Sequence, residues 1–181
     1  MSASSAYAIE VSPTKKQVNK ALADGRAAAR LQTPPSKLFW RFGSPDTLSP
    51  HGMLMTKLSG LAVLSAHYSF RSTMPSPEDI RRVMEDEFLQ VSVVIFGLSP
   101  SFAVNSYILF KQGERLIKPA KVRADARARR SEVWPNDPSF RAKVVASFPY
   151  GTFDSMLPTT ILVFPGTGGE ISFDVDFSAI P

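Results

Sequence analysis

Residues 170–177 read Glu-Ile-Ser-Phe-Asp-Val-Asp-Phe, a strict alternation of polar and apolar side chains near the end of the chain. Successive side chains of a β-strand point to opposite faces, so this period of two predicts a strand with one buried and one solvated face. We therefore expect Asp174 and Asp176 to be exposed. The side chains expected to be buried in this strand and the preceding one are Ile161, Val163, Ile171, Phe173, Val175 and Phe177.

Similar short β-type runs, separated by Pro and Gly, fill the second half of the chain. We predict seven strands, at residues 89–96, 102–110, 114–118, 121–126, 140–148, 159–164 and 170–177. Gly113 and the glycines within residues 165–169 lie where tight turns would join neighbouring strands. Seven short strands without the helices that parallel crossovers require indicate an antiparallel β-sandwich of immunoglobulin-like or fibronectin-like architecture.

Two helices are predicted in the first half of the chain, each opened by a Ser-Pro pair. One is an N-terminal, Ala-rich amphipathic helix over residues 13–32, and the other is a connecting helix over residues 76–88. The Pro-rich residues 33–51 predict an extended connector with one short strand. Residues 52–70 fit both periods, but seven of ten even positions are apolar against four of nine odd ones, which favours a long strand.

This pattern divides the chain into an N-terminal helix with its connector, residues 1–50, and a β-sandwich domain, residues 51–181. The apolar stripe of the N-terminal helix is mostly alanine, so its docking gains little free energy. We expect this helix to be the least stable part of the chain, held loosely on the sandwich or ordered by a second chain. A homo-oligomer formed through this helix is the second of these alternatives.

Positive charge is concentrated in residues 111–143, which hold ten Lys or Arg against four acids, whereas the whole chain has a net charge of +5. Such an excess can attract phosphates or an anionic membrane surface, although many charge runs are only solvated surface. Residues 123–130 alternate Arg with Ala and fit one strand with its arginines outward, and residues 131–138 fit an exposed loop. The candidate binding residues are Arg127, Arg129, Arg130, Trp134 and Arg141.

The sequence gives little support for a metal site, a phosphate-binding loop or a serine hydrolase site. The chain has no Cys and two His, so a thiolate site is excluded and a histidine-based metal site lacks partners. The glycine-rich residues 166–169 lack the Lys-Ser/Thr that grips phosphate, and no Gly-x-Ser-x-Gly is present. Asp174 and Asp176 could suit a hard cation but fit the water face of a strand better. We predict no cofactor, no metal ion and no membrane-spanning segment.

The favoured hypothesis is a non-enzymatic β-sandwich module that binds another protein or a polyanion through the basic surface and an exposed Trp134 loop. The alternative is a small-ligand binder or hydrolytic enzyme with a cleft where Trp40, His51 and His67 meet the sandwich. Residues 1–10 lack an export signal, which indicates a cytoplasmic protein as the sequence stands. The small-x-small residues 6–8 keep open a periplasmic, secreted or cell-envelope protein whose signal peptide has been removed.

Overall fold

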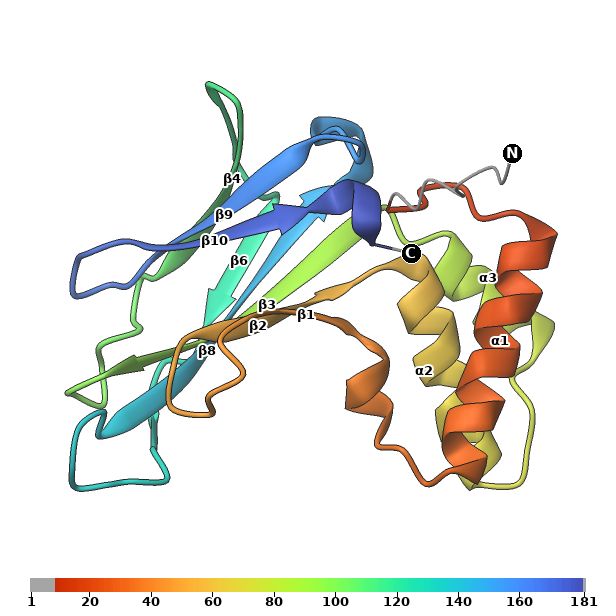
Figure 1. The fold of residues 1–181 in the computed structure, drawn as a ribbon, viewed down its shortest axis with the longest axis horizontal. Coiled ribbons are helices and arrows are strands. Elements are labelled where there is room, and N and C mark those ends of the chain that lie inside the picture. Colours follow the sequence, from red (N-terminus) through yellow and green to blue (C-terminus); the bar gives the residue numbers. More distant parts are fainter. Residues whose placement is uncertain (1–8, 181) are drawn as a thin grey trace, which may run out of the picture.

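Strands in two antiparallel sheets form the larger part of the regular structure in residues 9–180, the range that the computed structural model describes (Figure 1). The residues considered for an export signal lie mostly outside this range. Three α-helices accompany the sheets and lie together beyond one end of them (Figure 1). The predicted antiparallel, mainly β architecture is confirmed at this level.

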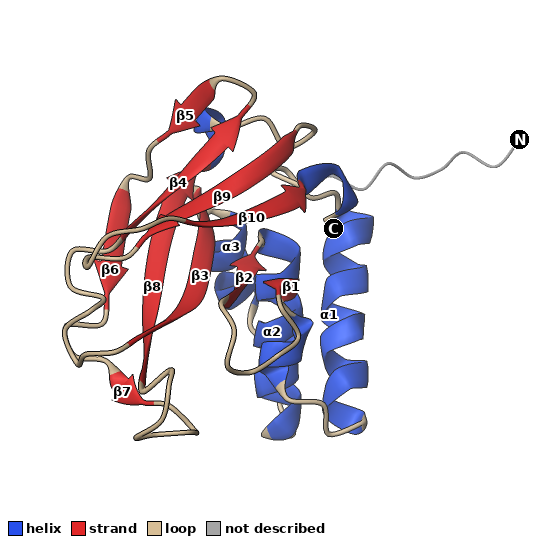
Figure 2. Ribbon diagram, turned by 60° about the vertical axis from the view of Figure 1, so that its left-hand side comes forward, coloured by secondary structure: helices blue, strands red, loops and turns tan. Residues whose placement is uncertain are grey.

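The first sheet has the strand order β1-β2-β3-β8-β6, and β7 pairs with the end of β8 (Figure 2). Its strands are β1 (Trp40–Gly43), β2 (His51–Met55), β3 (Phe88–Gly97), β6 (Lys121–Ala124), β7 (Arg129–Arg130) and β8 (Phe140–Pro149). β1 lies within the predicted connector, yet it pairs with β2 along its whole length. The division of the chain at residue 50 stays a prediction.

The second sheet has the strand order β10-β9-β4-β5. Its strands are β4 (Tyr107–Gln112), β5 (Arg115–Ile117), β9 (Pro158–Phe164) and β10 (Ile171–Asp176). Short 3-10 helices occur at Pro35–Leu38, Tyr150–Thr152 and Phe177–Ala179. Gly113 closes the turn between β4 and β5 with φ +57°, a left-handed conformation that glycine adopts without the steric cost of a Cβ.

Side chains from both sheets share one hydrophobic core. Phe110 of β4 is fully buried and its ring stacks on that of Phe148 of β8, with centroids 3.6 Å apart. Phe153 and Phe177 meet the Phe110 ring edge-on. Ile9, before the first helix, and Ile180, after the last strand, are buried in the same core. Aromatic contacts across the sheets therefore hold the β-rich part together.

The register predicted for the last two strands agrees with the structure. Asp174 and Asp176 are exposed. Ile161, Val163, Val175 and Phe177 are buried, and Ile171 and Phe173 are half-buried. The two half-buried residues lie on β10, which is the edge strand of its sheet and has a neighbour on one side only. The alternation determines to which face of the sheet each side chain points. The position of β10 at the edge of the sheet limits how deeply its side chains are buried.

The prediction of a long strand over residues 52–70 is wrong. β2 ends at Met55, and helix α2 (Lys57–Phe70) follows it. Thr56 caps the helix, because its hydroxyl accepts from the Ser59 N–H at 3.2 Å while Ser59 Oγ accepts from the Thr56 N–H at 2.9 Å. The buried face of α2 consists of Leu61, Ala62, Ser65 and Ala66, which is a helical spacing. The excess of apolar even positions was coincidental.

Three other boundaries also differ from the predictions. Residues 102–106 turn before β4 begins, because Phe102 inserts into the core and Asn105 adopts a left-handed φ of +64°. The connecting helix α3 (Pro77–Met84) ends earlier than residue 88, where β3 already begins. The predicted single strand over residues 123–130 is divided into β6 and β7, because the chain bends and the Ala128 N–H donates to the Pro100 carbonyl at 2.7 Å.

Helix α1 (Lys15–Arg30) packs closely on α2 through small side chains. Gly25 faces the Ala62 carbonyl so closely that an added Cβ would lie 2.1 Å from the oxygen. The Ser65 hydroxyl donates to the Leu22 carbonyl at 2.7 Å. The thin stripe of α1 is therefore covered within the same chain by α2, whose sequence pattern had predicted a strand.

The helices have a hydrophobic cluster of their own, distinct from the core between the sheets. Ala21, Leu22 and Leu61 form its buried centre, with α3 contributing Ile80, Val83 and Met84 at its edge. Among the described residues, no helix is long and apolar enough to cross a membrane.

Candidate interaction surface

The register of the first sheet brings basic residues from distant parts of the sequence onto one face. Residues directly opposite each other on paired strands point to the same side of a sheet. Because Phe42, Leu54, Val91, Ala146 and Val122 point to the core, their neighbours point outward. One continuous row of the outer face runs across five strands through Arg41, Met53, Ser92, Val145 and Arg123.

Parallel rows add further basic side chains to this outer face. Lys121 lies opposite Ser147, Lys143 opposite Val94, and Arg141 between Phe96 and Arg129. All six of these Lys and Arg side chains are exposed. We call this surface the basic face, and it consists of Arg41, Lys121, Arg123, Arg129, Arg141 and Lys143.

The centre of the basic face is apolar and only half-buried. Met53, Val94, Phe96 and Val145 lie there. The rings of Phe96 and His51 lie 6.4 Å apart. This arrangement offers apolar contact surrounded by positive charge.

Two acidic residues contact the basic face and partly offset its charge. Asp125 accepts the backbone N–H of Lys143 at 2.9 Å, and Glu132 lies 3.8 Å from Arg141. The Arg141–Glu132 pair is largely solvated, so it contributes little net free energy. The face therefore keeps an excess of four positive charges over these two contacts.

The Trp134 loop, residues 131–139, projects next to β7. Its base is closed by a hydrogen bond from the Ser131 N–H to the Ser139 carbonyl at 2.9 Å. Trp134 is 43% exposed, and the Arg130 guanidinium lies over its ring at 3.9 Å from the centroid. This cation–π contact holds an exposed indole beside the basic face.

The sequence-predicted site residues gather around β7, but not on one surface. Arg129 and Arg141 are neighbours on the basic face, whereas Arg130 turns toward Trp134. Arg127 is exposed in the bend between β6 and β7. Sequence reasoning missed the contributions of Arg41, Lys121, Arg123 and Lys143 as members of one face. Only the strand pairing, which joins residues about eighty positions apart, could have shown it.

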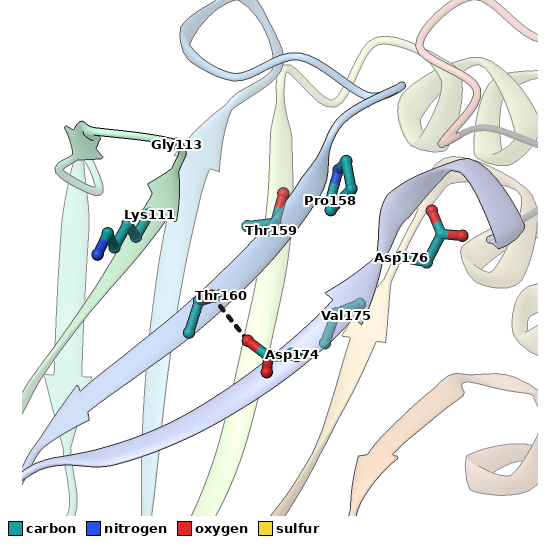
Figure 3. A pocket seen from close by; sticks show the side chains of 8 residues that line it. All are labelled: Lys111, Gly113, Pro158, Thr159, Thr160, Asp174, Val175 and Asp176. Carbon is teal, nitrogen blue, oxygen red and sulfur yellow. Dashed lines mark hydrogen bonds between the residues drawn. The ribbon is translucent and has the colours of Figure 1, made fainter.

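A hollow of about 550 Å³ lies on the other sheet, at the outer side of β9 (Figure 3). Lys111 of β4 and Asp174 of β10 lie on opposite sides of Thr160, whose hydroxyl donates to Asp174 at 2.8 Å (Figure 3). Asp176 lines the same hollow. Within residues 9–180, no group of three or more His, Cys, Asp or Glu is placed to hold a metal ion.

A second hollow of about 290 Å³ lies in the hairpin between β1 and β2. Arg41, Asp46 and His51 line it. The Leu48 N–H and the Ser49 hydroxyl donate to Asp46 and lower the pKa of its carboxyl, and His51 adds a smaller effect. His51 Nδ1 lies 2.8 Å from the Ser49 carbonyl. These contacts are those of a structured turn.

The alternative hypothesis expects a cleft where the N-terminal half of the chain, with Trp40, His51 and His67, meets the predicted sandwich. His51 lines the hairpin hollow, but Trp40 packs against the core and His67 is exposed on α2. Neither hollow described above is lined by all three residues. Titratable side chains do converge at His51, where Arg41 and Asp46 line the same hollow, so the alternative hypothesis stays a prediction.

Comparisons with known proteins add no relative to this description. No protein-family model matches the chain, and no curated protein has a significantly similar sequence.

Proposed function

We propose that this chain is a non-enzymatic binding module that holds a polyanion on the basic face, with the Trp134 loop as a second contact. The observation that carries the proposal is the register of the first sheet, which aligns six exposed Lys and Arg side chains on one face. A row of fixed positive charges matches the repeating charge of a polyanion and releases its counterions on binding.

The architecture that we propose for this module is a β-sandwich of immunoglobulin-like or fibronectin-like type. Two antiparallel sheets whose inner side chains share one core support it. In such a fold both outer faces are available to partners, and the helices at one end leave the basic face open to solvent (Figure 1).

The electrostatics favour a polyanion over a small anionic substrate. A small substrate would need several groups converging in an enclosed pocket. The basic side chains instead lie on β1, β6, β7 and β8, and Arg41 and Arg123 stand at the two ends of a row five strands wide. At about 4.8 Å per strand, this distribution spans about 20 Å, the length of several repeating units of a polyanion.

The proposal is tested by salt-dependent binding to heparin and to a short single-stranded oligonucleotide. The triple variant R123A/R129A/K143A removes charges from three strands of the basic face, and none of these side chains forms an ion pair among the described residues. We expect it to elute from heparin at clearly lower salt. The dependence of log K on log salt should become shallower by about 0.7 to 0.9 for each lost phosphate contact.

The matched control K15A/K16A/R30A removes the same charge from the exposed surface of α1. It should retain most of the wild-type affinity, because it leaves the basic face intact. Equal losses in both triples would show that net charge alone, and not the basic face, governs retention. Absence of binding to either probe at low salt would overturn the proposal, and binding only to an acidic protein would redirect it to that class.

The contribution of the Trp134 loop is measured separately with W134A. Aromatic stacking on bases contributes roughly 1 to 3 kcal/mol per base, so oligonucleotide affinity should fall about fivefold or more. Heparin, which has no bases, should be bound almost as well as by the wild type. A W134A variant unchanged toward both probes would remove the loop from the proposed site.

A further inference from the structure

The outer face of the second sheet differs in character from the basic face. Its centre is apolar, with the half-buried Leu109 of β4 opposite the buried Leu162 of β9, and Tyr107 stacked on Phe164 at 4.6 Å between centroids. Tyr107 is 45% exposed, and Leu116 of β5 is 57% exposed. The helices lie beyond the end of the sheets and do not cover this face (Figure 2). Exposed apolar surface of this kind marks contact with another protein.

Opposite charges flank Thr160, which neighbours this apolar centre on the same face of β9. Lys111 of β4 and Asp174 of β10 both pair in register with Thr160 of β9. The positive group thus lies one strand to one side of β9, and the negative group lies one strand to the other side (Figure 3). Within the described residues neither side chain forms an ion pair.

This charge pattern is self-complementary under one particular two-fold rotation. An axis that runs along β9, in the plane between two stacked sheets, exchanges the two sides of the strand. Lys111 of each copy then faces Asp174 of the other, and the β9 strands of the two copies lie over each other at the axis. An axis across the strands through the same row would instead bring like charges together. The pattern therefore selects both the partner and the orientation.

We propose that the outer face of the second sheet binds a second copy of this chain, with a two-fold axis along β9 and reciprocal pairs between Lys111 and Asp174. Stacked sheets lie about 10 Å apart, a separation that long Lys and short Asp side chains can bridge. Rotation about β9 lays β10 of one copy on β4 of the other, so three strands of each copy and the seven residues of β9 define a contact of about 14 by 23 Å. This contact is smaller than a standard protein interface, so the dimer should be weak, with a dissociation constant in the high micromolar range.

The test is sedimentation velocity over the micromolar concentration range, with the full chain. The wild type should pass from monomer to dimer as its concentration rises. Each single charge reversal, K111D or D174K, places like charges opposite each other and should raise the dissociation constant at least about tenfold. The matched control K37D reverses an exposed lysine of the 3-10 helix at Pro35–Leu38 and should dimerise as the wild type does.

Mixing the two single variants provides the decisive measurement. In a heterodimer of K111D with D174K, the introduced aspartate of one copy faces the introduced lysine of the other. The native Asp174 of the first copy faces the native Lys111 of the second, so both reciprocal pairs are restored. We expect the equimolar mixture to dimerise although neither variant does so alone. A loss caused by misfolding would not be rescued in this way, and circular dichroism checks that each variant keeps its strand content.

Three outcomes would overturn this inference. The wild type could stay monomeric over the whole range, the single reversals could dimerise normally, or the mixture could stay monomeric. None of these results bears on the polyanion proposal, because Lys111 and Asp174 lie on the opposite sheet from the basic face.

Discussion

The β-rich part and the helical part of this molecule are stabilised in different ways. Large side chains from both sheets interlock around Phe110, which contacts three other phenylalanine rings. The helices share a separate cluster whose buried centre, among the described residues, consists of Ala21, Leu22 and Leu61. Their contact depends on close approach instead, with Gly25 of α1 against the backbone of α2.

One chain thus combines a large hydrophobic core between its sheets with a small helix–helix contact. The helix–helix contact depends on close backbone approach and therefore tolerates little added side-chain volume. Burial of a large aromatic side chain contributes several kcal/mol, whereas an alanine contributes much less. The sheets should therefore unfold last, and the helical cluster should open first. Substitutions in each part test this contrast.

The largest effect is expected for Phe110→Ala in the core. Truncation of a fully buried phenylalanine costs about 3 to 5 kcal/mol in the free energy of unfolding, because it removes apolar burial and leaves a cavity. Urea denaturation measures this loss. Leu116→Ala on the neighbouring strand is the control, since Leu116 is exposed and should change stability by less than about 0.5 kcal/mol. Similar losses in the two variants would contradict the assigned core.

Phe173 shows how the structure refines an expectation from sequence. The alternation predicts a buried Phe173, and truncation of a fully buried phenylalanine would cost about 3 to 5 kcal/mol. Because Phe173 lies on edge strand β10 and is half-buried, Phe173→Ala should cost clearly less than Phe110→Ala.

A smaller effect is expected for Gly25→Ala in α1. The new Cβ would lie 2.1 Å from the Ala62 carbonyl oxygen, so the helices must separate. Overpacking costs about 1 to 3 kcal/mol, of which the better helix propensity of alanine returns roughly 1 kcal/mol. Hydrogen exchange should show faster exchange in α1 and α2, with β3 and β8 unchanged.

Gly60→Ala in α2 is the matched control for this substitution. Its Cβ would lie 3.3 Å from the movable Cγ1 of Val83, so it should be neutral or stabilising. If both variants leave helix exchange unchanged, the contact of α1 with α2 is looser than the structure shows.

Ser76→Ala tests the cap of α3 and should cost about 1 kcal/mol. The Ser76 hydroxyl accepts from the Asp79 N–H at 3.1 Å and donates to the Asp79 carboxylate at 2.7 Å. Ser172→Ala, an exposed position on β10, is the control. Denaturation followed by helix and strand signals separately would show whether the loss is confined to the helices.

Asp79 adds a pH dependence to this cap. Hydrogen bonds from the Ser76 and Tyr68 hydroxyls lower the pKa of the Asp79 carboxyl. A carboxyl with a lowered folded-state pKa stabilises the fold above its unfolded pKa of about 4, and this contribution is lost as the pH falls through the folded value. Asp79→Asn should therefore be less stable than the wild type at neutral pH, and the difference should shrink below about pH 4.

Sequence reasoning predicted the β-rich second half better than the first half, for a physical reason. Polar and apolar side chains alternate in residues 170–177 because a single strand has one solvated and one buried face. This pattern can therefore be recognised from the sequence of the strand alone. In α2 the apolar residues fit both periods, and the deciding feature was the Thr56 cap with Ser59 at its third position. The small-residue contact with α1 depends on a partner helix that the local pattern did not reveal.

The candidate surface was predictable only in part. A cluster of Arg around Trp134 was visible as local composition, and the structure does place Arg130 over the Trp134 ring. Which residues belong to the basic face depends instead on the order of the strands, in which β1 lies next to β2 and β8 lies next to β6. Arg41 and Arg123 share one row for this reason, and no local signal relates them.

The smallest effect on stability is expected for the triple variant R127A/R129A/R130A. All three side chains are exposed and form no ion pair among the described residues, so their removal leaves the core and the helical cluster unchanged. The cation–π contact of Arg130 with Trp134 contributes about 0.5 to 1 kcal/mol at such an exposed site, which sets the expected loss. Thermal denaturation measures this loss, and Trp134→Phe, which keeps an aromatic ring under Arg130, serves as its control. A loss of several kcal/mol would show that the arginines support the fold, whereas near-normal stability with weakened polyanion retention would assign them to binding.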